Sequence, residues 1–168
     1  MENSNAELLD NINDVIEDFR VAMLITIGSD NALNARPMSV AHHNEDTGDI
    51  YFITSSLTGK TAEIENNPQT GITLQSNTQF VSMSGQATVL KDHEMIRDLF
   101  NTAWEAWFPE GADQEDIRLI KFDPQEGEYW DMSGLSGLKF LWRTGKAILQ
   151  DEKVKMDDDP ESHGKVDM

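Results

Sequence analysis

The sequence lacks cysteine altogether among its 168 residues. This absence excludes disulfides, thiolate nucleophiles and cysteine-ligated metals in the chain. The sequence also lacks a run of about 20 apolar residues, which a membrane-spanning helix requires. The segment Met1–Asp10 is polar and acidic, without the basic and apolar regions of a signal peptide. We therefore expect a cytoplasmic protein without a membrane span.

Basic residues are scarce, with 13 Lys and Arg against 31 Asp and Glu and a formal net charge of −18. Nucleic-acid binding depends largely on neutralising phosphates with Lys and Arg, and anionic membranes attract basic surfaces. We therefore expect neither nucleic acid nor membrane as a partner. Any phosphate site in this chain must be local, built from a few well-placed cations and backbone N–H groups.

Recognisable metal and catalytic motifs are also missing. His42 and His43 are adjacent, so on a strand they point to opposite faces and cannot chelate one metal together. There is no nucleophile elbow and no dinucleotide-binding glycine pattern. We expect no metal site, and the sequence identifies no catalytic residue.

Hydrophobic periodicity predicts a mainly β chain. Apolar runs bounded by turn residues predict strands at Val21–Ile27, Ala32–Ala41, Ile50–Thr54, Gly71–Ser76, Phe80–Leu90, Ile117–Phe122 and Gly127–Met132. Many short strands with mostly short links are typical of an antiparallel β-barrel. The fold class predicted from the residues is therefore a β-barrel with peripheral helices.

Four helices are predicted around this barrel. They are an N-terminal helix with a capping box of Ser4 and Glu7, a short helix at Thr61–Glu65, a long helix from the N-cap Asp92 to Trp107, and a last helix at Leu138–Leu149. The segment from Asp151 to Met168 is polar and has too little apolar content to offset the entropy of ordering. We expect one domain over residues 1–150 and a disordered acidic tail over 151–168.

Two polar segments could hold an anion. Pro37 interrupts a strand pattern, which places it at a sheet edge or a bulge, and Arg36 beside it can make bidentate contacts with a phosphate. Farther on, the apolar strand ends in Thr54 and Ser55, and Lys60 follows at the start of a helix, a combination that favours anion binding. Each segment alone is equally compatible with an ordinary edge strand or an ordinary strand-to-helix turn.

Aromatic residues form a third group of candidates, Trp104, Trp107, Phe108, Tyr129 and Trp130. The helical spacing of Trp104 and Trp107 favours the core, because such stripes usually pack inward. A flat cofactor ring would also need aromatic walls, so both interpretations stay open.

These segments occur in one order along the chain. The set comprises Arg36-Pro37-Met38, Tyr51-Phe52-Ile53-Thr54, Lys60, Val81-Ser82-Met83-Ser84-Gly85, Ala106-Trp107-Phe108-Pro109-Glu110-Gly111 and Glu128-Tyr129-Trp130-Asp131. Together they resemble the general-stress-protein branch of the pyridoxamine 5′-phosphate oxidase-like superfamily, from about Ile16 to about Leu149.

This resemblance implies a Greek-key split β-barrel that forms a homodimer with FMN in clefts between the subunits. The implied cofactor-binding residues are Arg36, Pro37, Met38, Ser39, Phe52, Thr54, Ser55, Lys60, Trp107 and Trp130. Among them, the resemblance makes Arg36 and Lys60 the phosphate ligands. It makes Trp107 and Trp130 neighbours of the flavin ring, supplied by either subunit.

One departure from the family bears on the substrate. True pyridoxamine 5′-phosphate oxidases carry an Arg-x-His-x-Arg set after the Glu-aromatic-Trp motif, where this chain has Ser136, Leu138 and Phe140. The implied function is a flavin-dependent oxidoreductase of unknown substrate, not a true pyridoxamine 5′-phosphate oxidase. The alternatives are a non-catalytic flavin-binding stress protein, the same barrel with haem or a deazaflavin, and a β-barrel interaction module with an empty cleft.

Overall fold

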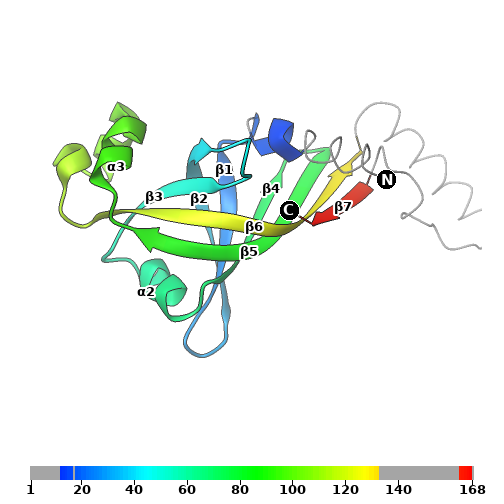
Figure 1. Ribbon diagram of the computed structural model, residues 1–168, viewed down its shortest axis with the longest axis horizontal. Helices are drawn as coiled ribbons and strands as arrows, with labels where there is room; N and C mark the ends of the chain where they lie inside the picture. The colour runs from blue at the N-terminus through cyan, green and yellow to red at the C-terminus, as the bar shows by residue number, and fades with distance from the viewer. Residues whose placement is uncertain (1–11, 17, 133–162, 168) are drawn as a thin grey trace, which may run out of the picture.

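Seven antiparallel strands dominate the structure, a computed structural model that describes residues 12–16, 18–132 and 163–167. The strands are β1 (Val21–Ile27), β2 (Leu33–His43), β3 (Ile50–Ser55), β4 (Gln69–Gln75), β5 (Gln79–Leu90), β6 (Ile117–Asp131) and β7 (His163–Asp167). Hydrogen bonding joins them in the order β3-β2-β1-β4-β5-β6-β7. Figure 1 shows β6 running along the molecule, with α3 near one end of it and β7 near the other.

A pairing between β3 and β6 closes the first six strands into a barrel. It joins Ile50 to Phe122 at one end and Ser55 to Ile117 at the other. The same β6 pairs with β5 along most of its length and with β7 beyond the barrel. Within these paired segments, β3 and β6 therefore present no exposed edge. The predicted β-barrel with peripheral helices is confirmed.

The sequence predicted two strands where the structure has the single β6. The register against β5 shifts between Ser84 and Gly85, opposite Pro124, so the long strand continues through a β-bulge. A Cβ atom on Gly85 would lie 2.1 Å from the carbonyl oxygen of Asp123, so only glycine fits this close approach. Pro124 interrupts the strand pattern in the sequence, but a proline is tolerated at a bulge because one residue there makes no ladder hydrogen bond.

The apolar side chains form two buried clusters. The larger one fills the barrel and includes Leu24, Phe52, Ile72 and Phe122. The smaller one includes Ile53, Ile96, Phe108, Ile117 and Leu119 and packs the outer side of β3 and β6 against the helical segment that follows β5. Phe52 and Ile53 point to opposite sides of β3, as strand alternation requires.

The helical segments differ in part from the prediction. The short helix α2 (Gly59–Asn66) follows β3 as expected, and residues 12–16 are helical. The expected long helix from Asp92 is instead α3 (His93–Leu99) followed by two 3₁₀ turns, η1 (Thr102–Ala106) and η2 (Gly111–Asp113). Asp92 does cap α3, as predicted. The helix does not continue through Asn101, because the Asn101 side chain accepts a hydrogen bond from the Ala103 N–H and starts a new turn. No helix in the described ranges combines the length and apolarity needed to traverse a bilayer.

The end of the chain also departs from the prediction of disorder over 151–168. Residues 163–167 form β7, which pairs with β6 from Glu126 to Trp130. The prediction considered only the low apolar content of this segment, whereas backbone pairing with the edge of β6 orders residues 163–167. The capping box of Ser4 and Glu7, the helix expected at Leu138–Leu149 and residues 151–162 lie outside the described residues.

Candidate functional site

A pocket of about 420 Å³ opens between β2, the end of β3, the start of α2 and the 3₁₀ segment. Its lining residues are Arg36, Pro37, Met38, Ser39, Ile53, Thr54, Ser55, Lys60, Trp104, Trp107 and Phe108. The polar segments and much of the aromatic group that the sequence singled out therefore meet at one place.

The β2 wall of the pocket is an edge of the sheet. Arg36 and Pro37 pair with β1, whereas β3 pairs with β2 only from Val40 onward among the described residues. Pro37 is therefore at an edge, as the sequence predicted, and its missing N–H breaks no ladder on that side. Residues 36–39 line the pocket, and on the side away from β1 they pair with no strand in the described part of the chain.

Lys60 is the second residue of α2 and brings an ammonium group to the pocket. Its Nζ donates to the hydroxyl oxygens of Thr54 and Thr58, both at 3.1 Å. The Thr58 hydroxyl donates in turn to the Ser55 carbonyl oxygen at 2.8 Å. Neutral hydroxyls thus fix the ammonium and leave its charge uncompensated by these contacts.

The surroundings lower the pKa of Lys60 from its ordinary value. Partial burial is the largest cause and the neighbouring Arg36 guanidinium adds to it, whereas Glu63 acts in the opposite direction. Two positive groups held near each other at one wall favour a negatively charged ligand. Such a ligand would stabilise the ammonium and raise the pKa of Lys60 again.

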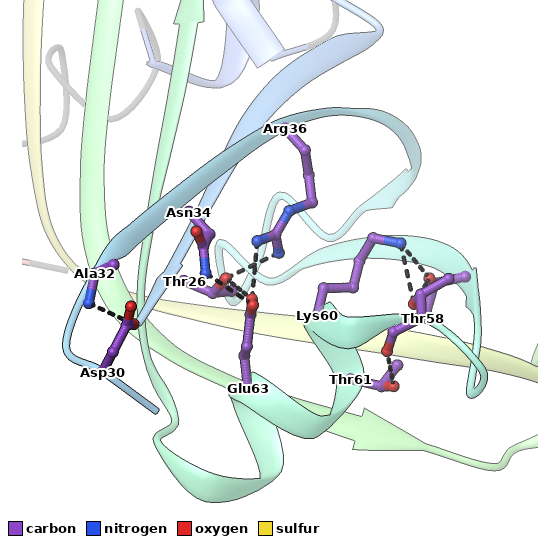
Figure 2. Close-up of polar contacts among 10 residues, drawn as sticks. Thr26, Asp30, Ala32, Asn34, Arg36, Thr58, Lys60, Thr61 and Glu63 are labelled. Carbon is purple, nitrogen blue, oxygen red and sulfur yellow. Dashed lines mark hydrogen bonds and ion pairs between the residues drawn. The ribbon is translucent and has the colours of Figure 1, made fainter. Parts of the chain in front are cut away.

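Arg36 lines the pocket and also contacts other side chains of the protein. Its Nη2 forms an ion pair of 2.8 Å with the Glu63 carboxylate, and its Nη1 donates to the Thr26 hydroxyl at 2.8 Å. Figure 2 shows Arg36 reaching Glu63 on α2, while the Lys60 side chain runs toward Thr58. The two cations of the site are therefore anchored differently.

Ser55 occupies the pocket rim at the end of β3. Its hydroxyl donates to the Asp116 carboxylate, which also accepts from the Gln114 side-chain amide at 2.7 Å. The hydrogen bond from Ser55, followed by that from Gln114, lowers the pKa of Asp116. Ser55 Oγ also accepts from the Leu57 N–H at 3.0 Å, so its hydroxyl braces the loop before α2.

Aromatic side chains from the 3₁₀ segment form the opposite wall. Phe108 is buried in the smaller core cluster and Trp104 packs against that cluster, with an edge-on contact to Phe100. Trp107 is instead 72% exposed, which contradicts its predicted place on the buried face of a helix. Because the chain turns at Asn101, Trp107 lines the pocket and leaves a large aromatic surface exposed.

Two predicted site residues do not line this pocket. The Phe52 side chain is completely buried in the barrel core, whereas its neighbour Ile53 is the one that lines the pocket. Trp130 pairs with Phe80 and His163 near the far end of β6, away from the Ile117 end that pairs with Ser55.

Glu63, which contacts the site through Arg36, was not predicted from the sequence. The sequence does carry one indication of its role. Glu63 lies three residues after Lys60, and residues three apart on a helix share a face. Trp104 and Phe108 were noted as aromatic candidates but not assigned to the site, since their spacing favoured the core.

Comparisons with known proteins agree with this architecture. The family model for pyridoxamine 5′-phosphate oxidase like proteins matches residues 7–155. General stress protein 26 of Bacillus subtilis (strain 168) is 28% identical over 118 residues, covering 67% of this chain and 81% of that protein. A crystal structure of a candidate general stress protein 26 from Jannaschia sp. CCS1 has a TM-score of 0.69 at 27% identity, covering 97% of this chain and 99% of that one.

A third relative is a flavin-binding protein. The crystal structure of a general stress FMN/FAD binding protein from Xanthomonas citri has a TM-score of 0.68 at 24% identity, covering 77% of this chain and 92% of that one. The barrel topology, the family match over most of the chain and these relatives point to the same assignment. The chain belongs to the pyridoxamine 5′-phosphate oxidase-like family, has its split-barrel fold and is a homologue of general stress protein 26.

Proposed function

We propose that this protein binds FMN in the pocket and acts as a flavin-dependent oxidoreductase on a small molecule that is still unidentified. The observation that carries the proposal is the Lys60 ammonium, held by two hydroxyl groups in a pocket that the exposed Trp107 also lines. FMN combines a phosphate with a flat ring system, and this pocket offers a partner for each part. The FMN/FAD binding relative from Xanthomonas citri supports the same ligand class.

The chain's own residues suggest how the ligand would lie. The phosphate would approach Lys60 and Arg36, where charge-assisted hydrogen bonds are available. The edge of β2 at residues 36–39, to which β3 does not pair among the described residues, would run beside the ligand. The exposed face of Trp107 would cover part of the ring and keep water from it.

Bound FMN would supply reversible electron transfer, so the protein's task would be to bind, orient and shield it. The pocket holds Lys60 and Arg36 but no side chain that we assign as a general base. Ser136, Leu138 and Phe140 stand where true pyridoxamine 5′-phosphate oxidases carry cations for a substrate phosphate. We therefore propose a substrate other than pyridoxamine 5′-phosphate.

We further propose that two copies of the chain form a homodimer with the cofactor at their interface. Val21 is 55% exposed and Leu33 is 72% exposed, and both are apolar residues of the β1–β2 hairpin that carries the pocket wall. A second subunit would cover this surface. In such a dimer, Trp130 of one subunit could reach the cleft of the other.

An absorption spectrum of the purified protein and titration of apoprotein with FMN test the ligand. We expect flavin absorbance and saturable FMN binding, whereas haem or deazaflavin absorbance would replace FMN as the cofactor. A pocket that takes up no chromophore would favour an interaction module.

Anaerobic mixing of the FMN-loaded protein with NADH or NADPH then tests catalysis. Bleaching of the flavin band followed by reoxidation by an added acceptor supports an oxidoreductase. Stable binding without reduction by either donor would favour a non-catalytic carrier, buffer or sensor.

A further inference from the structure

Three hydrogen-bond donors converge on the Glu63 carboxylate. The Thr26 hydroxyl donates to Oε2 at 2.5 Å, Arg36 Nη2 donates to the same oxygen at 2.8 Å, and Asn34 Nδ2 donates to Oε1 at 2.8 Å. Figure 2 shows these three side chains gathered on Glu63. The donors come from β1 and β2, so one helical residue ties both strands to α2.

The environment keeps Glu63 in its charged form. The Thr26 hydrogen bond is the largest cause of its lowered pKa, and the contacts with Arg36 and Asn34 add to it, although burial opposes them. Thr26 is fully buried, and the ion-paired side chains of Arg36 and Glu63 are only 22% and 20% exposed. The group is therefore better shielded than a typical surface ion pair.

The geometry also separates the roles of two residues on α2. Lys60 and Glu63 are three positions apart, yet Lys60 lines the pocket while Glu63 receives Arg36. Arg36 itself lines the pocket, and the guanidinium has five N–H donors, more than its contacts with Thr26 and Glu63 use.

We propose that Glu63 is a positioning residue of the anion site: it fixes the Arg36 guanidinium so that its remaining donors act together with Lys60 on the ligand phosphate. This inference rests on the proposed FMN function. The opposite role, in which Glu63 only reduces the positive charge of the site, predicts an effect of opposite sign on FMN affinity.

The test compares FMN and riboflavin, which lacks the phosphate, in the wild type and in Glu63→Ala, Glu63→Gln and Glu65→Ala. We expect Glu63→Ala to weaken FMN binding about 3- to 10-fold, the range that one net hydrogen bond supports. Riboflavin affinity should stay within about twofold, because the phosphate contact alone is affected. Glu65 is exposed on the same helix, so Glu65→Ala controls for the loss of one negative charge.

The glutamine variant measures whether geometry or charge matters more. Its amide oxygen can still accept from Arg36 and Thr26, provided that the Asn34 amide turns to offer its oxygen to the new NH₂ group. Glu63→Gln should therefore restore part of the FMN affinity lost in Glu63→Ala. A positioning role also predicts that Glu63→Ala weakens FMN binding no further in an Arg36→Ala background.

The outcomes are distinct. Unchanged or tighter FMN binding by Glu63→Ala would overturn the positioning role, and so would an equal loss of riboflavin affinity, which would mark a general structural effect. If the wild type binds no FMN, the proposed function and this inference fall together. If it binds FMN in preference to riboflavin and Glu63→Ala behaves like wild type, only this inference falls.

Discussion

At the scale of single residues, Lys60 is anchored differently from several other cations of the described residues. Arg97, Lys121 and Lys165 are ion-paired with carboxylates, as surface cations in an acidic protein would be expected to be. Lys60 instead contacts two threonine hydroxyls. A phosphate at the pocket would therefore gain an ammonium that it does not have to share with a carboxylate at these contacts.

Replacing Lys60 by alanine should weaken FMN binding about 10- to 150-fold, because a charge-assisted contact contributes roughly 1.5–3 kcal/mol. Riboflavin should bind the wild type more weakly than FMN does and should be almost unaffected by the substitution. Lys91→Ala, which removes an exposed cation just after β5, is the matched control. Fluorescence titration with both ligands measures the effect, and parallel losses for FMN and riboflavin would make Lys60 a structural residue.

We predict that His43 lowers the stability of the folded protein in acid. Burial is the main cause of its lowered pKa, the neighbouring His42 adds to it and Glu45 opposes it, and neither ring nitrogen has a hydrogen-bond partner among the described residues. The unfolded chain therefore takes up a proton below pH of about 6.5, before the folded protein does. Stability should be fully present above that pH and fall as the pH drops toward the lowered pKa of the folded state.

Melting temperatures between pH 7.5 and pH 5 measure this effect. His43→Leu should flatten the decline, because the buried group can no longer be protonated. A slope that is the same in wild type and His43→Leu would contradict the assignment.

Much of the pocket could be predicted at the residue scale, and the failures have physical causes. Pro37 and Lys60 sit in local patterns, an interrupted strand and a strand-to-helix turn, that carry their own signals. Phe52 was misplaced because a family motif does not say which of two adjacent strand residues faces inward. Glu63 was missed because its importance depends on Arg36, Thr26 and Asn34, which are distant in sequence and meet only in the fold.

At the scale of secondary-structure elements, β6 shows what local patterns predict and what they do not. Its two apolar halves were visible in the sequence, but their continuity depends on the bulge opposite Ser84 and Gly85, a property of the pair of strands. The break between α3 and η1 was missed for a related reason. Helical spacing continues across Asn101, although its side chain competes with the helix for a backbone N–H.

Gly85→Ala should destabilise the barrel by about 1–3 kcal/mol or more, the usual cost of overpacking, because the new methyl group would meet backbone atoms that cannot move aside. Gly71→Ala is the matched control, since a Cβ there would lie no closer than 3.7 Å to any neighbour. Chemical denaturation followed by tryptophan fluorescence compares the two variants with wild type. Equal stability of both variants would show that the bulge relaxes easily.

Truncation after Ser162 should remove β7 and lower the melting temperature, because five residues of strand pairing are lost. The amides of residues 126–130 in β6 should then exchange hydrogen faster. The pocket of the same subunit should be unaffected, since β7 pairs with the end of β6 away from it, so a loss of FMN affinity would support the proposed place of Trp130 in the cleft of the second subunit. Unaltered exchange in this segment would mean that β7 contributes nothing to the edge of β6.

At the scale of the whole molecule, the fold class and family were the most predictable features. The alternation of Val81 and Met83 with Ser82 and Ser84 fixes which face of β5 packs inward, and short links then restrict how strands can pair. The interface residues of the proposed homodimer could not be predicted from the sequence, because no local pattern says which exposed apolar residues meet a second subunit.

We expect a homodimer in solution at micromolar concentration, with one FMN bound per subunit. An obligate dimer interface buries more than about 2,000 Å² in total, and burial of Val21 and Leu33 would contribute to it. Sedimentation velocity measures the number of subunits in the particle, and flavin quantification measures the number of FMN molecules per subunit. A monomer that binds FMN with full affinity would show that one chain suffices for the cofactor site.

The closure of the barrel by β3 and β6 has a consequence for how the chain folds during synthesis. β3 must remain without its second neighbour until α2, β4, β5 and α3 have left the ribosome, because β6 comes after all of them. Pairing between strands so distant in sequence is slow, since loop-closure entropy is lost before any contact is gained. The pocket is lined by the end of β3 and by the 3₁₀ segment that directly precedes β6, so it would then be among the last parts of the nascent protein to become competent for its ligand.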